Sequence, residues 1–264
     1  MRRIFFQGCS VVVLFFAAWF ALRQVDWMSF FKVKQATESL EEKLGDIFSE
    51  IFGRDELYSS SVTAPIDSIL TRLCTENDID RDQIKLHIVD NDEVNAFALP
   101  DKHLVVFSGL ILSAENESEV CGVLGHELAH IQLGHVMKKL VKEIGLSVLI
   151  SMTAGGSGEV VREAAKMLSS SAFDRELERE ADIKSVDYMV KADIRPEPFA
   201  DFMFRLSGEE TEIAKALTWV STHPDSKDRA EYIIGYSKNK RCEYRPVLSE
   251  ESWENLQKRL GEGE

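Results

Sequence analysis

Hydrophobic residues recur at helical spacing along most of the chain, and they alternate with polar residues in one short region. The alternating region predicts β-strands at residues 85–89, 94–99 and 103–107, and their short connections predict a small antiparallel sheet. Helical spacing elsewhere predicts a mostly helical α+β fold. We expect helices at 40–51, 65–76, 116–143, 159–190 (as one or two helices), 196–208, 212–220, 228–236 and 250–260.

The longest of these helices has a recognisable start. Asn116 can cap it, and Glu119 lies three residues later, as in a capping box. Gly145 interrupts the pattern, and the apolar residues 146–154 that follow are too few to span a bilayer. A glycine-rich, flexible turn follows at 155–158. We therefore expect residues 146–154 to form a mobile flap or a buried helix.

Residues 4–22 form the one apolar run that is long enough to cross a membrane. As a helix the run would be about 28 Å long, which matches the hydrocarbon core of a bilayer. A cleaved signal peptide would also begin with Arg2 and Arg3, but no small-residue cleavage site follows the run. We therefore expect an uncleaved single-pass anchor at 1–25, with the rest of the chain on the periplasmic or extracytoplasmic side.

Composition narrows the possible partners. The chain has 264 residues and a net charge of −14, and this acidity argues against nucleic acid as a partner, which needs a basic face. Cys9 lies in the expected anchor, and Cys121 has the setting of a small core residue. Cys74 and Cys242 could pair in an oxidising compartment. No C-x-x-C pair occurs, so a cysteine zinc site is not expected.

The segment His126-Glu127-Leu128-Ala129-His130 carries the strongest chemical pattern, H-E-x-x-H within a predicted helix. Histidines four residues apart lie on one helix face, so both can reach one metal ion, and Glu127 can border the open coordination position as a general base. The alternative is a solvated helix face with two ordinary histidines. The rest of this helix is apolar, which indicates burial, and buried polar groups need partners. The pattern therefore favours a zinc ion.

A catalytic zinc usually has a third protein ligand. His135 is one candidate, but on a continuous helix it would lie roughly 140° away from His130, and we expect it to be structural. Another candidate is Glu178, which lies four residues before Asp182 on a later predicted helix. Glu178 could bind the metal while Asp182 accepts a hydrogen bond from a ligand histidine. On composition alone, an exposed charged helix is the favoured interpretation of this run.

Four segments in order carry a resemblance to a known family: residues 95–100 (NAFALP), 126–130 (HELAH), 178–182 (EREAD), and His223-Pro224 with Arg229. They resemble the membrane-associated gluzincin zinc metallopeptidases, which include HtpX, the CAAX prenyl endopeptidase, and the Oma-type and periplasmic β-barrel-assembly-enhancing proteases. The resemblance implies a zincin-like domain, which we place at 62–240. The helical spacing before it predicts an amphipathic helical linker at 26–61, and the residues after it form a charged tail at 241–264. The resemblance also implies Glu178 as third ligand and His223 near the zinc. The chain departs from the multi-span members, because one membrane segment is expected.

These observations together predict a zinc metalloendopeptidase with one Zn2+ per chain. His126, His130 and Glu178 would hold the metal, and Glu127 would act as general base. His223 would be a zinc latch or an oxyanion donor, unless it is a surface histidine that caps a helix. Asn95 and Ala96 would pair with an extended substrate by strand addition, and Arg229 would orient the loop of His223 or bind the substrate terminus.

The resemblance alone implies the biological role, which is quality control of misfolded or misassembled envelope proteins. The rival class is a non-hydrolytic binding or chaperone-like module on the same fold, with a closed or structural zinc site. Glu127 argues against that class, because a structural site needs no base. A third possibility is a dormant protease kept shut by residues 144–158.

Overall fold

A computed structural model describes residues 33–52, 60–153, 163, 166–168, 172–207, 222–223, 226–238, 240 and 243–262. The expected anchor at 1–25, the glycine-rich turn at 155–158, the helix expected at 212–220, Pro224, Cys9 and Cys242 lie outside these residues. The chain divides into two compact units after Glu41, and the sheet and every helix from α4 onward belong to the second. Among the described helices, none combines the length and the apolar character that a membrane crossing requires. The anchor and the domain boundaries therefore stay predictions.

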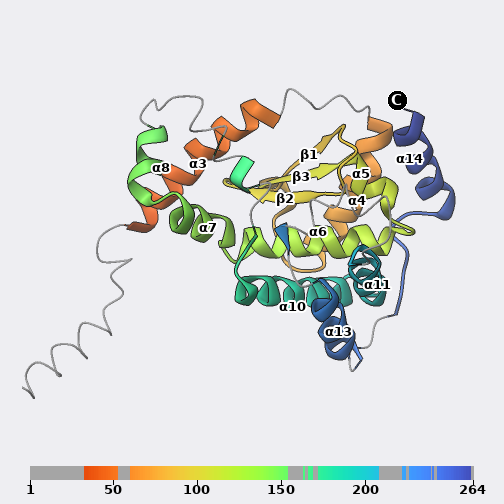
Figure 1. Ribbon diagram of the computed structural model, residues 1–264. Helices are drawn as coiled ribbons and strands as arrows, with labels where there is room; N and C mark the ends of the chain where they lie inside the picture. Colours follow the sequence, from red (N-terminus) through yellow and green to blue (C-terminus); the bar gives the residue numbers. More distant parts are fainter. Residues whose placement is uncertain are drawn as a thin grey trace, which may run out of the picture. The chain divides into compact units, whose positions relative to one another are not determined.

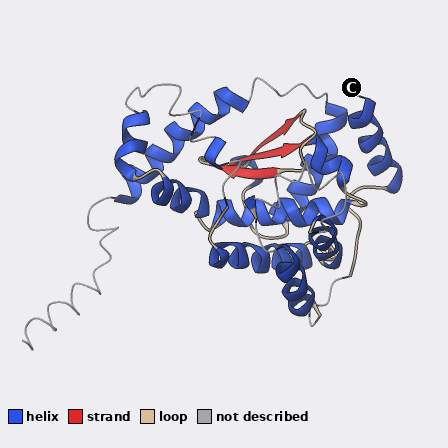
Figure 2. Cartoon of the chain, in the orientation of Figure 1, coloured by secondary structure: helices blue, strands red, loops and turns tan. Residues whose placement is uncertain are grey.

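The fold is α+β and mostly helical, as the hydrophobic pattern predicts, with one small sheet among the helices (Figure 2). The strands are β1 (Lys85–Val89), β2 (Ala96–Leu99) and β3 (His103–Phe107), which follow a short 3-10 turn, η1 (Arg81–Gln83). The helices are α3 (Val33–Phe52), α4 (Ser60–Thr75), α5 (Ser108–Ser113), α6 (Glu117–Gln132), α7 (His135–Glu143), α8 (Leu146–Thr153), α10 (Arg175–Lys191), α11 (Glu197–Leu206), α13 (Ser226–Ser237) and α14 (Glu250–Glu262).

The sheet is mixed, which corrects the prediction of a purely antiparallel one. Its strand order is β1-β3-β2, so β2 and β3 form the expected antiparallel hairpin while β1 pairs with β3 in parallel. The connection at 90–95 carries the chain to the far side of β3. Gly109 explains why it can do so, because its amide donates to the Asn91 carbonyl at 2.9 Å and a side chain there would collide with the backbone of Asp92. The consequence is that β2 lies at an edge of the sheet.

Helices α4 and α5 differ from the prediction. Helix α4 begins at Ser60 rather than at Pro65, so Ser60 and Ser61 are helical. Val62 and Ile66 are fully buried, and this packing holds the first turns although Pro65 offers no amide hydrogen. The short helix α5 was not predicted, because its six residues are too few to show a periodicity.

The long helix expected at 116–143 is two helices. Its start is as predicted, with the Asn116 side chain accepting from the Glu119 amide at 3.2 Å. It ends at Gln132 because Gly134 adopts a left-handed conformation, with φ of 65°, and α7 begins in a new direction at His135. The position of His135 therefore cannot be calculated from a continuous helix.

Helix α6 lies at the centre of the second unit, with the sheet on one side and α10 and α11 on the other (Figure 1). The Ser185 hydroxyl donates to the Gly122 carbonyl at 2.8 Å and ties α10 to α6. Cys121 belongs to the core, as predicted, and Cys74 is there too as a free thiol. Helix α14 adds three side chains to the same core from the charged tail: Trp253, Leu256 and Leu260.

Candidate metal centre

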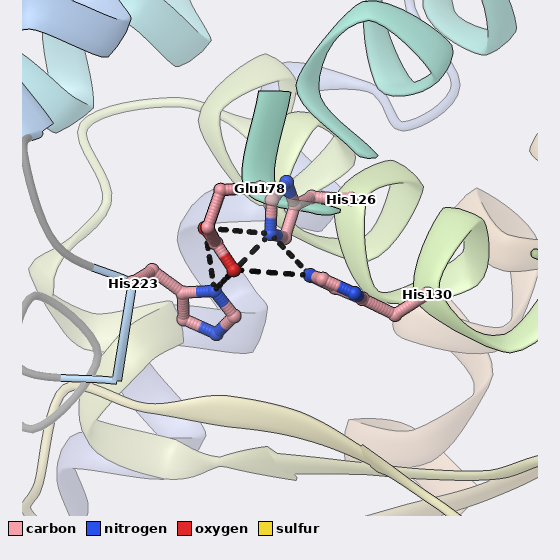
Figure 3. Close-up of side chains that lie close together, drawn as sticks. All are labelled: His126, His130, Glu178 and His223. Carbon is pink, nitrogen blue, oxygen red and sulfur yellow. Dashed lines mark hydrogen bonds and ion pairs between the residues drawn. The ribbon is translucent and has the colours of Figure 1, made fainter. Parts of the chain in front are cut away.

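Four buried side chains converge beside α6: His126, His130, Glu178 and His223 (Figure 3). One nitrogen or oxygen atom from each lies within 4.8 Å of the others. The histidines of H-E-x-x-H come from successive turns of α6, Glu178 comes from the first turn of α10, and His223 comes from the segment before α13. We call these four residues the candidate metal centre.

The spacing of the donor atoms suits a small cation. The Nε2 atoms of His126 and His130 are 2.9 Å apart, and they lie 3.6 and 3.4 Å from the carboxylate oxygens of Glu178. The Nδ1 atom of His223 lies 3.2 Å from the His126 Nε2 and 2.9 Å from Glu178 Oε1. Tetrahedral zinc with bonds of about 2.0–2.1 Å separates its ligand atoms by roughly 3.3 Å. These four residues therefore fit one tetrahedral ion.

The carboxylate of Asp182 contacts the ring of His126 on the side away from the candidate metal centre. Its Oδ1 lies 2.9 Å from the Nδ1 of His126, so the Nε2 of that ring is left to face the centre. Burial by itself would lower the pKa of His126, but its hydrogen bond to Asp182 and the negative charges of Asp182 and Glu178 together outweigh burial and raise it. The carboxylates therefore stabilise positive charge at His126. The Tyr232 hydroxyl also donates to Asp182.

Arg229 neutralises part of the buried negative charge. Its guanidinium is 3% exposed, and it donates to both carboxylate oxygens of Asp182, at 2.7 and 2.6 Å, and to the His223 carbonyl at 2.9 Å. It also contacts Glu178 at 2.7 Å. Burial would raise the pKa of Glu178, yet His223 and Arg229 hold it well below its usual range. With Glu127, which contacts His223, the site holds three buried carboxylates, and Arg229 pairs with two of them, so a divalent cation would balance the remaining negative charge.

Glu127 faces the sheet edge and the centre at once. One oxygen accepts a hydrogen bond from the Ala98 amide of β2 at 3.0 Å, and the other lies 3.4 Å from the His223 Nε2. The side chain is fully buried. The candidate base is therefore fixed between the edge strand and His223.

The two predicted substrate-pairing residues differ in what their backbones can offer. The Asn95 carbonyl accepts from the Phe107 amide at 3.1 Å, so it faces β3. Because neighbouring residues of a strand alternate, the backbone groups of Ala96 and Ala98 face away from β3, toward the sheet edge beside Glu127. Pairing at the edge would therefore use the amide and carbonyl of Ala96 and the carbonyl of Ala98, because the Ala98 amide already donates to Glu127, and Asn95 is a buried residue behind them.

Comparison with known proteins decides the family. The profile of peptidase family M48 matches residues 60–236, which include all four residues of the candidate metal centre. The chain belongs to peptidase family M48. This assignment confirms the resemblance that the four sequence segments carry.

Relatives of this M48 chain include three named proteases. It is 28% identical over 174 residues to the mitochondrial metalloendopeptidase OMA1 of Schizosaccharomyces pombe, a match covering 65% of this chain and 52% of that protein. It is 25% identical over 197 residues to the β-barrel assembly-enhancing protease of Yersinia pestis, covering 67% and 40%. With the metalloprotease LoiP of Escherichia coli it shares 28% over 192 residues, covering 67% and 75%. The chain thus spans about half the length, or less, of the first two relatives.

The sequence did not indicate Phe173 as part of this M48 site. Its ring stacks on His130 with centroids 4.1 Å apart, and it lies nearly parallel to His223 at 5.8 Å. Its amide donates to the Thr222 carbonyl at 3.3 Å, which joins the segments that carry Phe173 and His223. On the sequence, Phe173 is a single aromatic residue with no periodic neighbours, so no pattern pointed to it.

Loss of Arg229 should destabilise the fold independently of any activity. Arg229→Met leaves Glu178 and Asp182 buried with their ion pair broken, and removal of one partner of a buried pair costs about 3–5 kcal/mol. Denaturant unfolding of the metal-free protein measures this loss. The exposed Arg179 of α10 provides the control, since Arg179→Met should change the free energy of unfolding by ~0.5 kcal/mol or less. Equal stability of the two variants would show that Arg229 does not hold the site together.

Proposed function

We propose that this M48 chain is a zinc metalloendopeptidase in which His126, His130 and Glu178 hold one Zn2+. The observation that carries the proposal is the convergence of these three ligands with Glu127, a buried carboxylate that none of the ligand roles requires. A bound zinc ion would polarise the scissile carbonyl and lower the pKa of an attacking water to about 7. The family membership and the names of the relatives agree with this activity.

Glu127 is the residue that would move the proton. Its carboxylate would take the proton of the attacking water and then deliver it to the leaving amine. The hydrogen bond from Ala98 at 3.0 Å holds one oxygen of this carboxylate, so the other oxygen is oriented toward the centre. A non-hydrolytic binding module would have no use for a fixed base at this point, and this is why we favour the enzyme.

The substrate would be an extended polypeptide that pairs with the edge of β2 that lies away from β3. Ala96 offers an outward amide and carbonyl and Ala98 an outward carbonyl, and strand addition uses such groups without regard to side chains. We propose misfolded or misassembled envelope proteins as substrates, with a single-pass anchor at 1–25. One relative is named for enhancing β-barrel assembly, and this name supports the choice of substrate class.

Removal of the metal tests this function. Full-length protein in detergent should cleave an unfolded substrate such as casein, should lose this activity with a zinc chelator, and should regain it when Zn2+ is added back. A protein that binds casein equally well with and without metal, and releases no fragments, would instead be the binding module. The Glu127→Gln variant serves as the control for contaminating proteases.

His223 would act as a latch in the resting enzyme. Its Nδ1 lies within 3.2 Å of His126 Nε2 and within 2.9 Å of Glu178 Oε1, where a fourth ligand belongs, and its Nε2 is directed at Glu127. An oxyanion donor would have to stand away from the ligand atoms. We propose that substrate displaces His223 and so frees both the fourth position and Glu127.

Replacement of His223 distinguishes the two roles. Because a latch competes with substrate, His223→Ala should retain zinc and raise the rate of casein cleavage at low substrate concentration. An oxyanion donor predicts the opposite, a fall in kcat of about 10²–10³-fold with zinc retained. Unchanged kinetics would remove His223 from the site. Zinc content must be measured in the same samples, so that loss of metal is not mistaken for loss of catalysis.

A further inference from the structure

His135 and Glu180 stand in line behind His130, on the side away from the candidate metal centre. The Nδ1 atoms of His130 and His135 are 3.0 Å apart, and the Nε2 of His135 lies 3.1 Å from Glu180 Oε2. The His135 side chain is fully buried, while that of Glu180 is 55% exposed. The three side chains come from α6, α7 and α10, so the contact is not a consequence of one helix's spacing.

Only one arrangement of hydrogens gives every donor among His130, His135 and Glu180 an acceptor when His130 binds a metal. His130 directs its Nε2 at the centre, where it lies 2.9 Å from His126 Nε2 and 3.4 Å from Glu178, so a neutral ring that binds metal there carries its hydrogen on Nδ1. That N–H can donate to His135 only if the Nδ1 of His135 is bare. His135 then carries its own hydrogen on Nε2, which points at Glu180, a carboxylate that can accept it. Every donor therefore meets an acceptor.

The backbone supplies the geometry for this line. On an uninterrupted helix His135 would lie roughly 140° around from His130. The left-handed Gly134, with φ of 65°, ends α6 and turns the chain so that the His135 ring returns to His130, with ring centroids 5.1 Å apart. A residue with a side chain would be strained at this φ. Gly134 thus makes the contact possible.

We propose that His135, itself held by Glu180, is a positioning residue that fixes the tautomer and orientation of His130 for metal binding. The inference rests on the proposed zinc site. Each ligand histidine on α6 would then have a carboxylate that fixes its tautomer. Asp182 contacts His126 directly, and Glu180 acts on His130 through His135. Glu180 is half exposed and acts through an intermediate ring, so its own contribution is smaller than that of His135.

The test uses full-length protein in detergent and measures the dissociation constant of Zn2+ by competition with a chelator, together with the visible spectrum of the Co2+ form. His135→Phe keeps a ring but offers no acceptor, and it should weaken zinc binding by about 10–100-fold and alter the Co2+ spectrum. His135→Asn restores an acceptor oxygen close to the position of Nδ1, and it should recover most of the affinity. Glu180→Ala removes the acceptor for His135 and should weaken binding less than His135→Phe does, and Glu176→Ala, an exposed change one turn earlier on α10, should leave binding unchanged.

Wild-type zinc affinity in His135→Phe, or an equal loss in His135→Asn and His135→Phe, would overturn the proposal and leave His135 as a packing residue. If His135→Phe does not fold, the comparison passes to Glu180→Ala against Glu176→Ala, where equal zinc affinities overturn it. The proposed function fails separately: in that case the wild-type protein itself takes up no zinc, and this inference falls with it.

Discussion

Replacing Glu127 by glutamine should leave zinc bound and reduce kcat by about 10²–10⁴-fold, the usual contribution of a positioned general base. Glutamine has nearly the same shape, and its carbonyl oxygen can still accept the hydrogen bond from the Ala98 amide, so the site should keep its form. Its amide cannot take a proton from water. The change therefore removes proton transfer and little else.

The experiment compares initial rates of cleavage of a fluorogenic peptide by wild-type protein and the variant at equal zinc content. Glu176→Gln is the matched control, since it makes the same chemical change at an exposed site and should leave kcat unaltered. Activity equal to wild type in Glu127→Gln would end the peptidase interpretation. Loss of zinc from the variant would mean that Glu127 has a structural role.

Replacing Glu178 by alanine should abolish tight zinc binding, because it removes one of three ligands from a fully buried site. Asp182→Ala should cost less, on the order of 10–100-fold in affinity, since Asp182 acts on the metal through His126. Both variants also leave Arg229 with fewer partners, so their stability must be measured beside their affinity.

The variant Glu180→Ala tests which residue of α10 is the metal ligand. Glu180 lies two residues from both Glu178 and Asp182, but its side chain points at His135 and is half exposed. It should therefore weaken zinc binding far less than Glu178→Ala does. If Glu180→Ala alone removed the metal, the ligand assigned to α10 would be wrong by two residues.

Sequence alone predicted the parts of the site that depend on local spacing. The H-E-x-x-H residues share a helix face, and Asn116 begins that helix as expected, because each follows from residues one or two turns apart. The identity of Glu178 required the family resemblance, since a charged run on a helix is usually solvated. The structure instead places Glu178 and Asp182 in the interior, where Arg229 accompanies them.

The features that the sequence did not predict depend on contacts between distant segments. The parallel pairing of β1 with β3 follows from how the 90–95 connection passes over Gly109. The approach of His135 to His130 follows from one left-handed residue, Gly134, inside what the pattern predicted as a continuous helix. The stacking of Phe173 on His130 joins two segments more than 40 residues apart. None of these leaves a periodic pattern in the chain.

X-ray absorption at the zinc edge can show whether His126, His130 and Glu178 hold one zinc ion. For the zinc-loaded full-length protein we expect nitrogen and oxygen neighbours at about 2.0–2.1 Å, with outer-shell scattering from three imidazoles in the resting state and from two in His223→Ala. A sulfur neighbour at about 2.3 Å, or a shell of oxygens without imidazole scattering, would contradict this expectation.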